Sequence, residues 1–222
     1  MIAIKRSRLA VVTASLSATL ALSACGPTND DIAHSESSTA MYQAYNDSMT
    51  KMHSEMMLGM GYNDPDSAFT QGMLGHHLGA VDMAKIQLKY GKDPEMLQLA
   101  QKIIDAQEVE IEQMQKWLNS HPDVAAPMAD TGAMQQAYAT GMNDMHGEMT
   151  LGITDPNPDM AFARGMLPHH RGAVDMAEVQ LEYGQDPEML QLAQEIIAAQ
   201  QSEIEQMQNW IKANGGVESN AQ

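Results

Sequence analysis

The chain has little cysteine, few aromatic residues and little positive charge. It contains one cysteine, two phenylalanines and two tryptophans among 222 residues. A single cysteine excludes an intrachain disulfide framework, so packing alone must hold the fold together. Only 12 lysines and arginines stand against 29 aspartates and glutamates, which gives a formal charge of −17. Such a surface repels nucleic acid, and we expect no nucleic-acid partner.

Further missing features exclude several kinds of site. A blue-copper centre needs a cysteine ligand, and the only cysteine, Cys25, lies at the end of an export signal. The Glu-x-x-His motif is typical of carboxylate-bridged di-iron centres in helix bundles. This spacing does not occur in the chain. No Ser/His/Asp set or paired acid indicates hydrolysis. We therefore expect a protein that is not an enzyme.

The first residues resemble the signal of a bacterial lipoprotein. Basic residues precede an apolar stretch at 9–22, which is too short to span a bilayer. Residues 22–25 read Leu-Ser-Ala-Cys, which resembles a lipobox. That resemblance implies a signal peptide at 1–24 and lipidation of Cys25. We expect an exported protein, anchored by lipid to a membrane and facing the periplasm or the cell exterior; the alternative is a secreted protein with a free thiol.

The rest of the chain repeats itself after 93 residues. Residues 49–118 and 142–211 align without a gap, with 46 identities in 70 positions. The sequence therefore predicts two homologous repeats. The expected segments are a flexible tether at 25–40, a first repeat at 41–120, a linker at 121–132, a second repeat at 133–213 and a disordered tail at 214–222.

Each repeat has the pattern of three helices, and no strand pattern competes. Asp93-Pro94-Glu95 combines an N-cap, a proline in the first turn and an early acidic residue. Gly91 and Gly184 are predicted to end the helices before them in a left-handed conformation. Pro168 is predicted to kink the helix at 158–183. The expected helices are 40–58, 65–90, 94–119, 133–151, 158–183 and 187–213. We predict an all-α fold in which each repeat adds a short Met-rich helix to a long antiparallel hairpin, with four-helix-bundle or ferritin-like packing.

Methionine and histidine share the faces on which these helices should pack. Met49, Met52, His53 and Met56 fall at i, i+3, i+4 and i+7, so their side chains lie on one helical face. Leucine is the usual residue at such positions, because methionine specifies packing poorly. Thioethers and imidazoles together favour a soft ion, copper(I) or silver(I), over Mg²⁺ or Ca²⁺. The candidate metal ligands are Met49, Met52, His53, Met56, Met73, His76, His77 and Met83, and in the second repeat Met142, Met145, His146, Met149, Met166, His169, His170 and Met176.

The second helix of each repeat also carries a family resemblance. Residues 162–177 read Phe-Ala-Arg-Gly-Met-Leu-Pro-His-His-Arg-Gly-Ala-Val-Asp-Met-Ala, and residues 69–84 match this pattern at 12 of 16 positions, with Gly75 in place of the proline. The pattern resembles the signature of domain-of-unknown-function family 305. Members with this double arrangement include exported copper-binding proteins of the CopM type. The resemblance covers roughly 41–213 and implies a helical bundle with extracytoplasmic copper(I) binding.

Two functions therefore compete at this point. The first is a copper(I)-binding, and by the same chemistry silver(I)-binding, lipoprotein that sequesters copper, confers tolerance or passes the ion to a copper-exporting or copper-accepting protein. The alternative is a structural or partner-binding helical lipoprotein whose methionines only pack.

Overall fold

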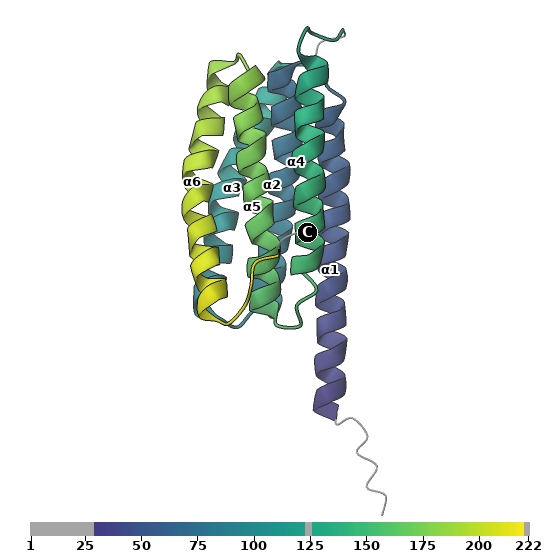
Figure 1. The fold of residues 1–222 in the computed structure, drawn as a ribbon, viewed down its shortest axis with the longest axis vertical. Helices are drawn as coiled ribbons and strands as arrows, with labels where there is room; N and C mark the ends of the chain where they lie inside the picture. The colour runs from purple at the N-terminus through teal and green to yellow at the C-terminus, as the bar shows by residue number, and fades with distance from the viewer. Residues whose placement is uncertain (1–28, 123–125, 220–222) are drawn as a thin grey trace, which may run out of the picture.

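The fold is a bundle of six helices, seen in a computed structural model that describes residues 29–122 and 126–219 (Figure 1). No strand occurs in these ranges, so the predicted all-α fold is confirmed. The segment predicted as signal peptide and lipobox, with Cys25, lies outside the described residues. The helices are α1 (Asn29–Met60), α2 (Pro65–Tyr90), α3 (Pro94–Ser120), α4 (Thr131–Gly152), α5 (Pro158–Tyr183) and α6 (Pro187–Ala213).

Capping residues set the starts of four helices where the sequence predicts them. The Asp64 side chain accepts from the backbone N–H of Ser67, at the start of α2. Asp93 and Asp186 each accept two N–H groups of the following turn, and Asn157 does the same for α5. Each cap is followed by a proline, whose missing N–H needs no partner in the first turn. Helices α2, α5 and α6 consequently have the predicted bounds.

The two repeats form one bundle around a central pair, α2 and α5. Helix α2 contacts α1, α3 and α5, while α5 contacts α4 and α6 as well as α2. The central pair is antiparallel, because the methyl of Met176 lies beside Gly72 and the methyl of Met83 lies beside Gly165. Helices α1 and α4 lie next to each other on one side of this pair, and α3 and α6 lie on the other (Figure 1).

Glycines allow the Met-rich helix of each repeat to approach the hairpin closely. A Cβ on Gly59 of α1 would lie 2.5 Å from the backbone nitrogen of Gly72 on α2. In the second repeat, a Cβ on Gly152 of α4 would lie 2.3 Å from the main-chain oxygen of Arg164 on α5. Backbone atoms cannot move aside as a flexible side chain can. These contacts fix α1 and α4 against the central pair.

Two buried carboxylates connect the repeats at the ends of the central pair. Asp159 of α5 accepts from Gln87 Nε2 at 2.6 Å and from the backbone N–H groups of Lys92 and Asp93. Asp66 of α2 makes the equivalent bonds to Gln180 and to the turn before α6. Each carboxylate therefore satisfies the turn of the opposite repeat's hairpin. Spacing within one repeat gives no indication of this exchange.

The chain departs from the expected segments at both ends. Residues 29–40, expected as tether, continue α1 as helix, and this part extends beyond the bundle (Figure 1). Residues 214–219, expected as disordered tail, turn back along α5. Glu218 forms an ion pair with Arg171, and the Ser219 hydroxyl reaches the main-chain oxygen of Arg164.

The predicted role of the glycines after α2 and α5 is wrong. Gly91 and Gly184 are extended, with φ of −68° and −71°, and are not left-handed. A Cβ at either position would lie 2.2 Å from the side-chain nitrogen of Gln87 or Gln180. Glycine is needed there because these glutamines reach across to the opposite repeat. Helix α5 continues through Pro168 as one element.

The inward face of α3 is also turned from its predicted position. Alternating spacings of three and four residues along this helix predict Leu97, Ile111 and Leu118 on its buried face, but all three are only half-buried. The face rotates because α3 also contacts α5 of the other repeat. The buried residues of α3 are Met96, Leu99, Ala100, Ile103, Ile104, Gln107, Met114 and Trp117.

Candidate metal site

Four histidines occupy the centre of the bundle, where α2 and α5 cross. His76 and His77 come from α2, His169 and His170 come from α5, and all four are fully buried. The rings of His76 and His169 lie 3.7 Å apart between centroids. His76 donates through Nε2–H to the main-chain oxygen of His169 at 3.0 Å. Because each helix supplies its pair at the crossing, the repeats meet at these imidazoles.

The second histidine of each pair contacts a carboxylate of the neighbouring helix. His77 Nε2 lies 2.7 Å from Glu110 Oε2 on α3. His170 Nε2 lies 2.7 Å from Glu203 Oε2 on α6. The histidines have no exposed side-chain surface, while about a fifth of each glutamate side chain is exposed. The carboxylates therefore join the buried imidazoles to the edge of the bundle.

The Nδ1 atom of each of the four histidines has no hydrogen-bond partner, and in His169 Nε2 has none either. Nδ1 of His76, His77, His169 and His170 is buried and makes no hydrogen bond in the protein. A main-chain oxygen can only accept a hydrogen bond, so His76 carries its proton on Nε2 and has a lone pair on Nδ1. An unpaired buried acceptor is costly. The centre of the bundle thus contains imidazole nitrogens that an ion could satisfy.

Burial keeps two of these imidazoles uncharged. Desolvation lowers the pKa of His76 well below its ordinary value, and the nearby His77 and His170 lower it further. Desolvation likewise lowers the pKa of His169, with added contributions from the surrounding histidines. Neutral imidazole is the form that binds a metal.

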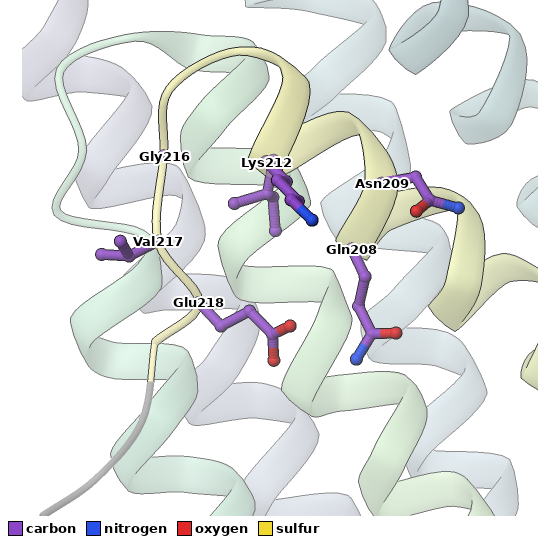
Figure 2. Close-up of a pocket in the computed structure, with 7 residues that line it drawn as sticks. Gln208, Asn209, Lys212, Gly216, Val217 and Glu218 are labelled. Carbon is purple, nitrogen blue, oxygen red and sulfur yellow. The ribbon is translucent and has the colours of Figure 1, made fainter.

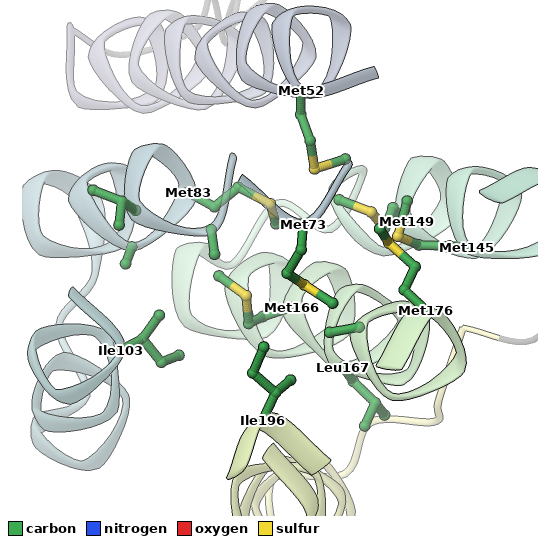
Figure 3. Close-up of a cluster of buried hydrophobic side chains, with 14 of the residues drawn as sticks. Met52, Met73, Met83, Ile103, Met145, Met149, Met166, Leu167, Met176 and Ile196 are labelled. Carbon is green, nitrogen blue, oxygen red and sulfur yellow. The ribbon is translucent and has the colours of Figure 1, made fainter. Parts of the chain in front are cut away.

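Every methionine predicted as a ligand is buried around this centre. Met52 of α1 lies over Gly79, one turn from His76 along α2, and Met145 of α4 lies over Gly172 in the same way. The methionine side chains drawn in Figure 3 point into the space between the helices. The predicted methionines, all nine-tenths or more buried, are Met49, Met52, Met56, Met73, Met83, Met142, Met145, Met149, Met166 and Met176.

The two sets of predicted ligands meet at the middle of one bundle. The methyl of Met176 lies 3.1 Å from the position that a Cβ on Gly72 would take. The methyl of Met83 lies 3.3 Å from the position of a Cβ on Gly165. These two methionines therefore reach into the opposite repeat. The four buried histidines and the ten predicted methionines of both repeats thus lie in one core, called the buried layer below.

His53 and His146 do not point into this layer. Both are exposed, on α1 and α4. Their rings face each other across the two repeats, with centroids 5.7 Å apart. Met49 of the same helix is buried, whereas His53 is exposed and its ring lies toward His146 on α4. The sequence alone does not show which helix lies next to His53.

Sequence reasoning missed Glu110 and Glu203. Each follows the His-His pair by 33 residues, and each is next to a position of the predicted inward face of the third helix. A carboxylate beside such a face is usually solvated, and no spacing rule joins it to a histidine on another helix.

A surface pocket lies away from these histidines. It has a volume of about 480 Å³ and is formed by the end of α6 and the returning tail, where Gln208, Lys212 and Glu218 surround it (Figure 2). None of its lining residues is a histidine or methionine. Within residues 29–122 and 126–219, no three His, Cys, Asp or Glu side chains form a group that could hold an ion.

Comparison with known proteins gives a family and several similar structures. The family described as "Domain of unknown function (DUF305)" matches residues 66–211. The chain is 33% identical to CopM in its Cu(I)-bound form, over 68% of this chain and 98% of that one, with a TM-score of 0.51. CopM has also been solved in Ag-bound and Cu(II)-bound forms.

A second similar structure is a DUF305 protein from Streptomyces coelicolor, described as a candidate secreted protein. It is 25% identical, over 72% of this chain and 99% of that one, with a TM-score of 0.56. No curated protein matches the chain. Among the described residues, no helix combines the length and apolar character needed to cross a bilayer.

Proposed function

This chain belongs to the DUF305 family, as its sequence pattern predicted, and we propose that it binds copper(I) outside the cytoplasm, for sequestration, tolerance or transfer. One observation carries the proposal. Four buried imidazoles, each with an unpaired Nδ1, share one buried core with the ten methionines of the predicted ligand set. Neutral imidazoles and thioethers are together a donor set for a soft monovalent ion.

The similarity to CopM supports the same ion. CopM has been solved with Cu(I), Cu(II) and Ag, and silver(I) shares the soft chemistry of copper(I). The proposed ligands are drawn from the sixteen methionines and histidines predicted from the sequence. His76, His77, His169 and His170 are the nitrogen donors of the buried layer. His53 and His146, exposed and paired, are the donors that solvent reaches first.

The proposed location rests on the N-terminal signal. Lipidation at Cys25 would hold the bundle at a membrane surface, where it would meet copper before or after transport. A copper-exporting or copper-accepting protein is the partner that this role requires. Export also suits the donor set, since thioethers need no reducing compartment to remain available, unlike thiolates.

Replacing thioethers by leucine separates binding from packing. The triple variant Met49→Leu, Met52→Leu and Met56→Leu should keep the fold, because leucine has a similar volume and well-defined rotamers. It should bind fewer copper(I) ions, or bind them at least tenfold more weakly, in native mass spectrometry and competition with a copper(I) chelator. The matched control is Met96→Leu with Met114→Leu, since both methionines are buried on α3 and lie outside the proposed ligand set.

The competing function predicts the opposite outcome. If the methionines only pack, the triple variant should be as stable as the original chain, or more stable, with unchanged copper binding. Equal loss in the triple variant and the α3 control would also contradict the proposed ligand set, because the change would then come from packing in general.

A further inference from the structure

We propose that Glu110 and Glu203 are positioning residues that fix the tautomers of His77 and His170 and so turn Nδ1 of each ring toward the metal layer. This inference rests on the proposed copper(I) function. The carboxylates themselves would not touch the ion. They would act through the imidazoles to which they are bonded.

The geometry of the two contacts carries the argument. Each glutamate oxygen lies 2.7 Å from Nε2 of its histidine. A carboxylate can only accept, so Nε2 must carry the proton in that contact. In the neutral ring the lone pair is then on Nδ1, the nitrogen that is buried without a partner. The contact with glutamate thereby determines which nitrogen faces the interior.

Burial explains why a carboxylate can serve here. A fully buried carboxylate would be expensive to ionise, but Glu110 and Glu203 keep about a fifth of their side chains exposed. Each can therefore keep contact with water at the bundle edge while it accepts a hydrogen bond from the buried ring. A carboxylate that accepts from one ring nitrogen orients the ring and makes the other nitrogen a better ligand.

His76 reaches the same state by a different contact. Its Nε2–H donates to the main-chain oxygen of His169, and its Nδ1 is unpaired. Three of the four buried imidazoles thus have a polar partner at Nε2 and none at Nδ1. If the glutamates had a purely structural role, each would satisfy Nε2 of its histidine, and nothing would compensate the cost of the unpaired Nδ1.

The tautomers can be read directly in the metal-free protein. Long-range ¹H–¹⁵N correlation spectra of the mature chain, labelled at histidine, distinguish protonation at Nε2 from protonation at Nδ1. We expect His77 and His170 to carry the proton on Nε2 alone. Glu110→Ala should change the tautomer signals of His77 and leave those of His170 in place, and Glu203→Ala should do the reverse.

Metal binding provides the second readout, with Ag(I) as a redox-inactive probe. Glu110→Ala should weaken Ag(I) binding about 10- to 100-fold. Glu110→Gln should restore most of the affinity, because its amide oxygen can still accept from Nε2–H. Glu112→Ala is the matched control, since Glu112 is an exposed acid on the same helix and should change neither signal. Circular dichroism and thermal melting show whether each variant is folded.

The outcomes separate this inference from the proposed function. An original chain that binds Ag(I), together with a Glu110→Ala variant of equal affinity and unchanged His77 tautomer, would overturn the positioning role alone. Protonation of His77 at Nδ1 in the original chain would overturn it too. If the original chain bound neither Ag(I) nor copper(I), the proposed function would fail, and the positioning role with it.

Discussion

At the scale of single residues, the main feature is a group of buried imidazoles with unmet bonding capacity. An unpaired buried acceptor costs about 1–3 kcal/mol, and Nδ1 of His76, His77, His169 and His170 is unpaired in the metal-free chain. A bound ion would remove that cost. Metal binding should therefore stabilise the bundle as well as occupy it.

Acid should destabilise the metal-free protein through His76 and His169. Burial holds the pKa of both below the unfolded value, which is about 6.5. Below that pH the unfolded chain takes up protons that the folded chain excludes, so stability is complete above about pH 6.5 and falls as pH decreases. The slope is up to about 1.4 kcal/mol per pH unit for each histidine.

Urea unfolding between pH 7.5 and 5.5 checks this prediction. The double variant His76→Gln and His169→Gln should lose stability less steeply with acid than the original chain, because the remaining histidines are common to both. Parallel pH dependences in the two proteins would show that these imidazoles are not held neutral by the fold.

Residue burial was predictable where one helix decides it, and not where a second helix does. Met49, Met52 and Met56 are buried as their i, i+3, i+7 spacing requires. The exposed position of His53, with its ring beside His146, depends on where α4 packs against α1. Helix α4 lies far from His53 in the sequence. The contact of Glu110 with His77 depends on how α3 is rotated about its axis against α2. The residue spacing of α3 predicts this rotation wrongly by about one position.

At the scale of elements, the close contact of α1 with α2 is the most demanding. Gly59→Ala would place a Cβ 2.5 Å from the Gly72 nitrogen, so α1 would have to move away from the hairpin. We expect a loss of about 2–3 kcal/mol or more in the free energy of unfolding, measured by urea denaturation.

A second glycine provides the control. A Cβ on Gly132 of α4 would meet nothing within 4 Å, so Gly132→Ala should be neutral or gain up to about 1 kcal/mol from helix propensity. A Gly59→Ala variant as stable as Gly132→Ala would mean that α1 is not held against α2 as the structure places it.

Helix ends were predictable where the local sequence determines them. Capping residues and prolines set the starts of α2, α3, α5 and α6, and these agree with the sequence prediction. The start of α1 was not predictable, because a segment rich in Ser, Thr and Asp has the composition of a tether. The conformation of Gly91 was not predictable either, since it depends on Gln87 reaching the other repeat.

At the scale of the whole molecule, the repeats depend on each other. Helix α2 packs against α5, and these two helices occupy equivalent positions in the two repeats. In residues 29–122 alone, the face of α2 that packs against α5 would be exposed. His76 and the neighbouring methionines of the first repeat would then contact water. Because the contact is nearly two-fold symmetric, the isolated repeat should pair with a second copy of itself.

Light scattering coupled to size-exclusion chromatography measures this directly. The isolated first repeat should elute as a dimer, or aggregate, while the complete chain remains monomeric at the same concentration. A stable, folded monomer of the first repeat would contradict the shared centre. The sequence could predict two repeats, but not that their ligand sets meet, because no local pattern encodes contacts 93 residues apart.

X-ray absorption at the copper K-edge tests the central claim most directly, using the protein loaded with copper(I) under reducing conditions. A site built from the buried layer should show both sulfur and imidazole nitrogen in the first coordination shell. The sulfur contribution should decrease in the Met49/Met52/Met56 to leucine variant. A shell of nitrogen and oxygen only, or no bound copper after removal of excess ion, would contradict the proposal.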